Sequence, residues 1–179
     1  MMPEILEITT YPHPALRKCA AEVDDVDAAL RKTILAMVET MYLNKGVGLA
    51  APQVGVRKKI VVFNPSSEKR EEQVLINPKI IERRGAMEGE EGCLSFPGIY
   101  GVVRRNAHIV VAAYDLEGNE VEFAATDFVA RLLQHEIDHL EGMLLVDRMT
   151  PESRILMRDA LKALEEAYNK TRGGAGEEH

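Results

Sequence analysis

The sequence predicts an α+β fold, in which short antiparallel β-sheets pack around a central α-helix and a further helix lies near each end of the chain. Three observations lead to this prediction. Apolar residues recur with helical spacing near the N-terminus, between residues 126 and 140, and near the C-terminus. Between the first two of these segments, β-branched runs alternate with turn residues. The length of 179 residues suits one compact domain.

The first helix is expected in the segment "DVDAALRKTILAMVETMYLNKG". Its apolar residues are spaced three or four positions apart, and they are Leu30, Ile34, Met37, Val38 and Met41. Acidic residues from Asp24 to Asp27 mark the start of this helix, and Asn44 to Gly46 mark its end. We therefore expect an amphipathic helix with one face on the core.

The strands are expected after a glycine- and alanine-rich turn, "GVGLAAPQVG". The segments "KKIVVFN" and "QVLINPKII" are rich in β-branched residues and predict strands that Pro65 and Pro78 interrupt. The segments "NAHIVVAAYD" and "EVEFAA" are joined across "LEGN" and predict a hairpin.

Two more helices complete the predicted fold. One runs from about Thr126 to Leu140, because Gly142 follows it as a helix-ending glycine. The other begins at Thr150 and Pro151, since proline suits the first helical position. Its apolar stripe consists of Met157, Leu161, Leu164 and Tyr168. We expect residues 1–172 to form a single domain and the small, polar residues 173–179 to form a disordered tail.

Composition narrows the classes of function. The net charge of -7 and the pI near 5.3 argue against broad nucleic-acid binding, so we expect no DNA partner. No segment approaches the roughly 20 apolar residues that cross a bilayer, so we expect no membrane partner. The chain has two cysteines, Cys19 and Cys93, and its first residues do not look secretory. These features predict a reducing, cytoplasmic setting in which Cys93 is available as a thiol or thiolate.

The segment "QHEIDHLEG" places His135 and His139 four residues apart, with Glu136 beside the first. Residues at this spacing lie one turn apart on one helix face, so both rings can point at one cation. Glu136 lies one step further round the helix, where its carboxylate would face water on the metal instead of binding the metal.

A charged, exposed helix could carry this histidine spacing by coincidence. The helix is apolar most of the way round, however, and this pattern is typical of a buried helix. Two buried imidazoles and a buried carboxylate each need a partner. A shared metal ion would satisfy all three, so we predict that the central helix is a metal-binding helix.

Cys93 is the candidate for the third ligand. It lies in "EGEEGCLSFPG", among glycines that let the backbone approach a site closely, and a thiolate binds divalent metals strongly. A lone cysteine is commonly a small buried apolar residue, but the acidic residues around Cys93 are not typical of a core. Downstream of His139, the carboxylates Glu141, Asp147 and Glu152 stand in no recognisable motif. Three protein ligands leave one tetrahedral position open, which is typical of a catalytic site.

A helix with this histidine pair is compatible with a metallopeptidase or with a non-catalytic metal-binding protein. A metallopeptidase would cleave internal peptide bonds, but its third ligand usually lies downstream of the histidines, where this sequence has no such motif. A non-catalytic protein, in which the metal only holds the fold together, would need a fourth protein ligand. The candidates for that ligand are Cys19, His13, His108 and His179, and none lies in a motif-like setting.

Three segments stand together in this sequence: "GVGLAAPQ" (46–53), "EGCLS" (91–95) and "QHEIDHL" (134–140). In their order and separation they resemble the motifs of the peptide deformylases, which remove the formyl group from the initiating methionine of new bacterial proteins. Three separate segments are far more specific than one. The resemblance covers roughly the whole chain, and it implies that residues 1–172 form a single catalytic domain.

The resemblance implies a metal site. Cys93, His135 and His139 would bind one divalent metal ion per chain, and Glu136 would act as the general acid/base. In this family the native metal is usually Fe²⁺, which oxidation removes easily, and Zn²⁺ or Ni²⁺ is found in its place. Thiolate and imidazole ligands suit all three metals, so the ligand set does not distinguish them.

The resemblance also implies how a substrate would be held. Gln53 and the backbone N–H of Leu94 would form the oxyanion hole, the pair of donors that stabilises charge developing on the formyl oxygen. Val47, Gly48 and Gly92 would line the peptide cleft and offer it backbone hydrogen bonds.

The implied substrates are formylmethionyl nascent peptides. An apolar pocket for the methionine side chain could be formed by Phe128, Leu132 and the ring of His135. Basic residues recur every four positions on the last helix, at Arg154, Arg158 and Lys162. Such a stripe is commonly a solvated face, and the sharper hypothesis is a weak contact with ribosomal RNA.

Overall fold

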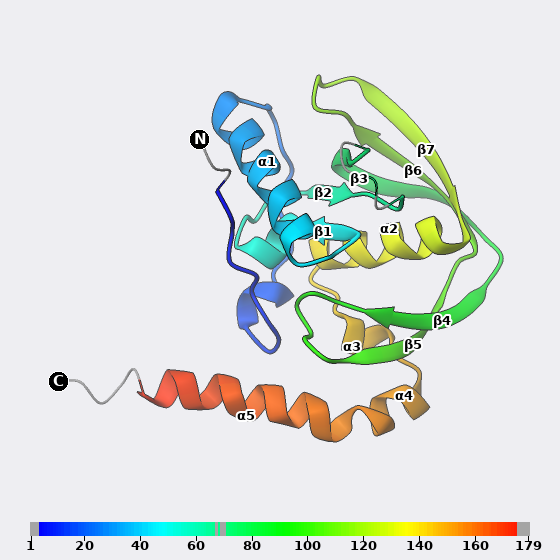
Figure 1. Ribbon diagram of the computed structural model, residues 1–179. Coiled ribbons are helices and arrows are strands. Elements are labelled where there is room, and N and C mark those ends of the chain that lie inside the picture. The colour runs from blue at the N-terminus through cyan, green and yellow to red at the C-terminus, as the bar shows by residue number, and fades with distance from the viewer. Residues whose placement is uncertain (1–3, 67, 69–70, 175–179) are drawn as a thin grey trace.

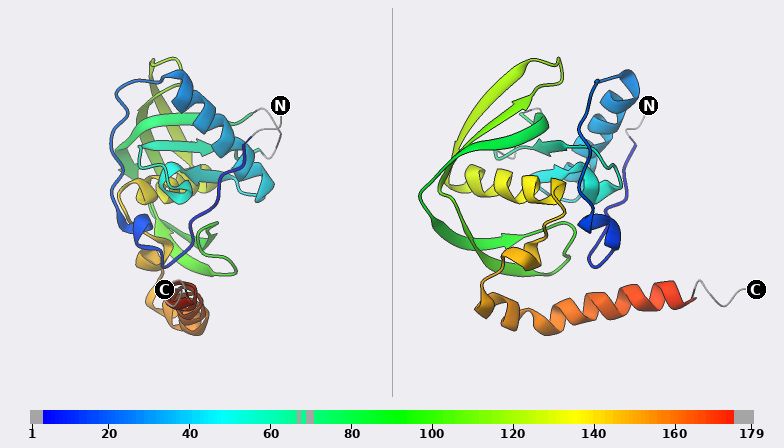
Figure 2. Two further views of the ribbon diagram at one scale, coloured as in Figure 1. Left: turned by 90° about the vertical axis from the view of Figure 1, so that its left-hand side faces the viewer. Right: turned by 180° about the vertical axis from the view of Figure 1, so that it is seen from behind.

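Helix α2 (Asp127–Leu140) lies between two antiparallel β-sheets in the computed structural model (Figures 1 and 2). The structure describes residues 4–66, 68 and 71–174. The larger sheet has the strand order β1-β2-β3-β6-β7, and the smaller sheet is the hairpin of β4 and β5. The predicted α+β class is confirmed, with the histidine-bearing helix at the centre.

The elements have the following bounds. The strands of the larger sheet are β1 (Gly48–Ala50), β2 (Ile60–Phe63), β3 (Gln73–Arg84), β6 (His108–Tyr114) and β7 (Glu120–Thr126). The smaller sheet is formed by β4 (Met87–Gly92) and β5 (Tyr100–Arg105). The other helical elements are η1 (Pro14–Arg17), α1 (Ala28–Leu43), η2 (Ala51–Val54), α3 (Leu145–Arg148), α4 (Pro151–Leu156) and α5 (Arg158–Gly174).

Helix α1 begins and ends where the sequence predicts. The Asp27 side chain caps it by accepting a hydrogen bond of 2.7 Å from the Leu30 N–H. The helix ends at Leu43, and Lys45 beyond it has a φ of 56°. Its apolar face is buried against β1 and β2, as the spacing of its apolar residues requires.

The prediction that Pro78 interrupts a strand is wrong, because β3 continues through it. The pairing of β3 with β6 shifts register between Ile76 and Lys79, and Asn77 there has a φ of 51°. Proline has no N–H to contribute to a ladder, and an irregular register removes the need for one at that position. Pro65 lies in the turn after β2, as predicted.

One hairpin was predicted and the other was not. The β6-β7 hairpin is confirmed, with antiparallel pairing from His108 with Thr126 to Tyr114 with Glu120. The β4-β5 hairpin was not anticipated, because β4 reads "MEGEEG" and lacks the β-branched residues that signal a strand. Glu91 is the one buried residue of β4, and its carboxylate lies against His135 of α2.

The C-terminal region forms two helices where one was predicted. Helix α4 ends at Leu156 and α5 begins at Arg158, so a break at Met157 divides the expected helix. The Tyr11 ring stacks on Phe96 with centroids 4.8 Å apart, and its hydroxyl donates a 2.5 Å hydrogen bond to Glu165. The N-terminal segment thereby ties α5 to the smaller sheet's loop (Figure 1).

Helix α5 extends to Gly174, two residues into the segment expected to be a tail. Residues 175–179 lie outside the described residues. Among the described residues, no helix combines the length and the apolar character that crossing a membrane requires.

Gly142, just after α2, provides a test of how closely the chain packs around this helix. Its φ is +72°, and a Cβ there would lie 2.4 Å from the backbone oxygen of Arg17. Gly118, in the β6-β7 turn, has a φ of +83° and open space around the Cβ position. We predict that Gly118→Ala lowers the free energy of unfolding by about 1–2 kcal/mol, the cost of left-handed backbone alone. Gly142→Ala should lower the free energy of unfolding by about 1–3 kcal/mol more than Gly118→Ala does, because of the steric overlap with Arg17.

Urea denaturation of the two variants beside the wild type measures both losses of stability. Because the two glycines share the backbone conformation, the difference between the variants isolates the contact with Arg17. Equal losses would contradict the close approach of the N-terminal segment to the end of α2.

Candidate metal centre and active site

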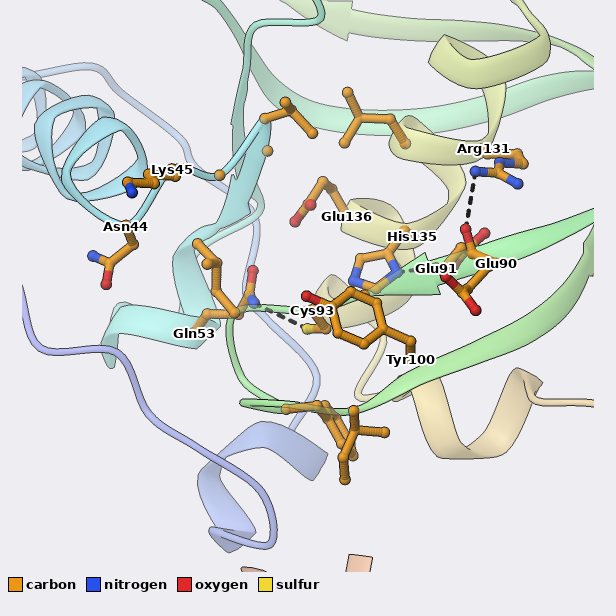
Figure 3. Close-up of a pocket in the computed structure, with 18 of the residues that line it drawn as sticks. Asn44, Lys45, Gln53, Glu90, Glu91, Cys93, Tyr100, Arg131, His135 and Glu136 are labelled. Carbon is orange, nitrogen blue, oxygen red and sulfur yellow. Dashed lines mark hydrogen bonds and ion pairs between the residues drawn. The ribbon is translucent and has the colours of Figure 1, made fainter. Parts of the chain in front are cut away.

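Three side chains that could bind a metal converge beside α2. His135 and His139 lie one turn apart on this helix, with ring centroids 5.0 Å apart. Cys93 comes from the turn after β4, and its Sγ lies 3.3 Å from His139 Nε2. One ligand atom from each of the three residues lies within 4.8 Å of the others. The fold therefore brings together residues that are 42 positions apart in the sequence (Cys93 and His135; Figure 3).

A buried chain of ion pairs orients His135. Its Nδ1 lies 3.0 Å from Oε2 of Glu91, which leaves Nε2 to face Cys93 and His139. Arg105 in turn donates two hydrogen bonds of 3.0 Å to the Glu91 carboxylate. Since the second ring nitrogen of a metal-binding histidine is usually held by a carboxylate or carbonyl, Glu91 has the position of such a partner.

The ion-pair chain continues to the surface. Arg105 also donates to Asp138 at 2.5 Å, and Arg148 donates two hydrogen bonds to the same carboxylate. Although burial raises the pKa of Glu91, the hydrogen bonds from His135 and Arg105 outweigh it and lower that pKa to about 2. Glu91 is therefore a carboxylate at neutral pH. This role of Glu91 was not predicted, and its one signal in the sequence is that an acidic residue opens the "EGCLS" segment.

Glu136 lies on the cleft side of α2, against β1. It is 4% exposed, and burial raises its pKa to about 7. A Cβ on Gly48 would lie 2.6 Å from Glu136 Oε1 and 2.7 Å from Leu132 Cδ1. Gly48 thus provides the space that the carboxyl group occupies, a reason for glycine that the sequence did not reveal.

Gln53 is held at both ends of its side-chain amide. Its Oε1 accepts a 2.9 Å hydrogen bond from the Ala50 N–H, and its Nε2 donates to Ser95 Oγ at 3.1 Å. The same Nε2 lies 3.6 Å from Cys93 Sγ (Figure 3). The amide is therefore fixed with its donor end beside the candidate metal ligands.

A cleft of about 630 Å³ opens in front of these residues (Figure 3). The residues predicted from the sequence that line it are Val47, Gly48, Gln53, Gly92, Cys93, Leu94, His135 and Glu136. His139 lies behind them and is 1% exposed. Phe128 and Leu132, the candidates for an apolar pocket, also line the cleft.

Two residues with no role predicted from the sequence, Tyr100 and Arg131, also line the cleft. The ring of Tyr100 packs on Gly92, where a Cβ would lie 2.7 Å from the ring. Arg131 lies one turn before His135, and its Nη2 donates a 3.1 Å hydrogen bond to the Glu90 carbonyl (Figure 3). Its guanidinium occupies the space beside Gly89, where a Cβ would lie 1.5 Å from Nη1. Small residues on β4 thus admit two large side chains at the edge of the cleft.

The residues present fit a divalent metal ion. The donors are one thiolate-forming sulfur and two imidazoles, a set that suits Fe²⁺, Zn²⁺ and Ni²⁺. Among the described residues, Glu136 Oε2 and His139 Nδ1 are buried without a hydrogen-bond partner. A buried, unpartnered carboxyl oxygen beside three ligand atoms is expected of a site that also receives water or substrate.

The residues considered as a fourth ligand lie elsewhere. Cys19 is exposed and donates to the Glu141 carbonyl at 3.6 Å. His13 caps η1 and contacts Tyr168, and His108 begins β6. His179 is outside the described residues. In the described part of the chain, the ligand group is limited to Cys93 and the two histidines of α2.

A sequence model of the polypeptide deformylase family matches residues 5–154. The chain belongs to this family. A peptide deformylase of Thermodesulfovibrio yellowstonii is 45% identical over 160 residues, which cover 88% of this chain and 97% of the relative. A peptide deformylase of Syntrophobacter fumaroxidans is 47% identical over 166 residues, which cover 91% of this chain and 98% of the relative.

Solved structures of the deformylase family have the same fold. The crystal structure of a plant peptide deformylase matches with a TM-score of 0.92 at 41% identity, covering 97% of this chain and 96% of that one. A peptide deformylase from Legionella pneumophila matches with a TM-score of 0.85 at 40% identity, covering 92% and 98% of the two chains. The α+β fold predicted from the sequence is therefore the deformylase fold.

We predict that Glu91→Gln weakens metal binding roughly 10- to 100-fold. The neutral amide orients the His135 ring less firmly, and the negative charge beside His135 Nδ1 is lost. Competition with a chelator measures the affinity. Glu90→Gln is the matched control, since this neighbouring side chain is exposed and successive residues of a strand face opposite sides of the sheet. Equal metal affinity in the two variants would show that Glu91 does not orient the ligand.

Proposed function

We propose that this chain removes the formyl group from the N-terminal formylmethionine of newly synthesised proteins and releases formate. The observation that carries the proposal is the convergence of Cys93, His135 and His139 beside Glu136, whose buried Oε2 has no hydrogen-bond partner among the described residues. Family membership supports the same reaction, since the relatives that match over most of the chain are peptide deformylases. We further propose that residues 1–172 act as a single catalytic domain.

Cys93, His135 and His139 would hold one divalent metal ion, with Fe²⁺ proposed as native and Zn²⁺ or Ni²⁺ as replacements. When bound, such an ion supplies Lewis acidity, which lowers the pKa of water toward about 7 and polarises a carbonyl. The buried Glu91 keeps the Nε2 of His135 directed at this position.

Glu136 moves the proton in the proposed reaction. Its Oε2 takes a proton from the water whose oxygen attacks the formyl carbon. The C–N bond of the formamide then breaks, and the same carboxyl returns the proton to the departing nitrogen of methionine. The products are formate and a free amino terminus. Burial of Glu136 between α2 and Gly48 keeps bulk water from competing for this proton.

Gln53 and Leu94 would stabilise the negative charge on the formyl oxygen. The Gln53 Nε2 and the Leu94 backbone N–H donate hydrogen bonds to that oxygen in the transition state. Support comes from the two hydrogen bonds that fix the Gln53 amide in advance, so little reorganisation is needed during the reaction.

The cleft would hold an extended peptide. The backbone groups of Val47, Gly48 and Gly92 offer it hydrogen bonds in the manner of an added strand. Phe128 and Leu132 would contact the methionine side chain from the metal-facing side of α2. The proposed substrates are nascent peptides, and the proposed setting is the cytoplasm, where such chains are made.

The proposed role of Glu136 predicts the phenotype of its substitution. Glu136→Ala should retain the metal but release formate from a formyl-Met peptide roughly 10²–10⁴-fold more slowly, because the proton transfer loses its carrier. An anaerobic formate assay and a metal analysis of the same samples measure both quantities. Glu141→Gln, at the exposed end of the same helix, is the control and should keep the wild-type rate. Formate release by Glu136→Ala at the wild-type rate would remove this residue from the mechanism.

A weak contact with the ribosome is a separate part of the proposal. Arg154, Arg158 and Lys162 are all exposed on α4 and α5, although Arg158 lies 3.4 Å from Asp159 and Lys162 lies 3.8 Å from Glu166. Replacing the three basic residues together with glutamine should weaken ribosome binding and reduce its salt dependence. Sedimentation with ribosomes at two salt concentrations measures both. Unchanged binding by the triple variant would end this hypothesis.

A further inference from the structure

A second hollow, of about 330 Å³, is lined by residues near the two places where the chain crosses between the sheets. The first crossing joins the end of β3 to β4, and the second joins the end of β5 to β6. Four arginines line the hollow, and they are Arg83, Arg104, Arg105 and Arg148. None of its lining residues lines the catalytic cleft. We call this hollow the arginine pocket.

Two of the four arginines, Arg105 and Arg148, share one counter-ion, the carboxylate of Asp138. Arg105 is 6% exposed and is paired with Glu91 below it and with Asp138 beside it. Arg148 makes two hydrogen bonds to the same Asp138 carboxylate. Asp138 is the one acidic residue that lines the pocket, and both of its oxygens already accept hydrogen bonds from arginine.

The other two arginines of the pocket, Arg83 and Arg104, have no counter-ion among the residues that the structure describes. Arg83 and Arg104 are exposed, and within the described residues neither takes part in an ion pair or a side-chain hydrogen bond. Glu88 lies opposite Arg104 in the β4-β5 register but forms no ion pair with it, and Glu82 is paired with Arg84. The pocket therefore has an excess of positive charge in a chain whose net charge is -7.

The two uncharged polar side chains of the pocket, Gln134 and Asn106, hydrogen-bond to the backbone around them. Gln134 accepts from the Asn106 N–H at 3.0 Å and donates to the Asn106 and Ala130 carbonyls at 2.9 Å. The Asn106 side chain donates to the Gly85 carbonyl at 3.1 Å. The charged hydrogen-bonding groups that remain are guanidinium N–H donors. A ligand that only accepts hydrogen bonds and carries negative charge is complementary to such a surface.

We propose that the arginine pocket binds a phosphate group. Guanidinium groups present planar, charged donors that match the oxygens of phosphate, and several of them around one hollow select a dianion over chloride. Arg105 and Arg148 are fixed by their carboxylate partners, so they form a rigid floor. Arg83 and Arg104 are exposed at the rim and close on the ion. The shared chemistry is a phosphate that is either free or part of an RNA backbone.

Titration calorimetry with inorganic phosphate tests this proposal on the full-length, nickel-loaded protein at constant ionic strength. We expect saturable binding of about one ion per chain at a site of this kind. Arg83→Gln combined with Arg104→Gln should weaken the binding roughly ten-fold or more, because both rim cations are lost. Neither residue contacts the catalytic groups, so formate release by this double variant should match the wild type and report that it is folded.

The matched control is Lys18→Gln combined with Arg57→Gln, which removes the same charge from exposed sites outside the pocket. This control should bind phosphate like the wild type. An absence of saturable binding, full binding by the rim variant, or equal weakening in both double variants would each overturn the proposal. The last two outcomes would place the ion at the metal or in the general field of the protein.

A labelled RNA duplex then distinguishes the two sources of phosphate. RNA that binds and is displaced by inorganic phosphate, and that loses affinity in the rim variant, identifies the RNA backbone as the ligand. Phosphate binding that is sensitive to the rim substitutions, with no such RNA binding, identifies free phosphate or a small phosphorylated molecule.

Discussion

The burial of polar and charged groups on α2 is the constraint on which the rest of the structure depends. His135, Glu136 and His139 are all less than a tenth exposed, and each would cost several kcal/mol without a partner. The two sheets meet this cost from opposite sides. The smaller sheet brings Glu91 and Cys93 to the histidines, and the larger sheet brings β1 against the carboxyl group of Glu136. The sheets therefore partner the helix chemically as well as covering it.

The sequence predicted those parts of the site that follow from local geometry. His135 and His139 are four residues apart, so any helix places them on one face, and the apolar residues around them indicate burial. Cys93 was found because the acidic residues around it are not typical of a core and the neighbouring glycines let the backbone approach a site. In the same way the ends of α1 and the β6-β7 hairpin follow from residues next to one another in the chain, and the structure confirms both.

The sequence could not predict features that depend on tertiary contacts. Glu91 is 44 residues from His135, and only the fold shows that it is the ring's partner. Strand β4 is too acidic and too rich in glycine to read as a strand, and only the fold shows that Gly92 and Gly89 leave space for the side chains of Tyr100 and Arg131. Pro78 was predicted to interrupt a strand because proline cannot donate to a regular ladder. The shift in register between β3 and β6 that accommodates it cannot be read from the sequence.

Arg105 connects the two sites of the molecule. A buried carboxylate that loses its cationic partner is strongly destabilising. Glu91 can therefore orient the His135 ring only while Arg105 neutralises the Glu91 charge. Arg105 then requires a second carboxylate, Asp138, and this carboxylate attracts Arg148. Each charged side chain is thus paired with one nearer the surface, and the last of them, Arg148, is exposed at the arginine pocket. Part of the positive charge there is thus a physical consequence of orienting a metal ligand in the interior. The need to orient His135 does not explain Arg83 and Arg104 at the rim, which have no partner among the described residues.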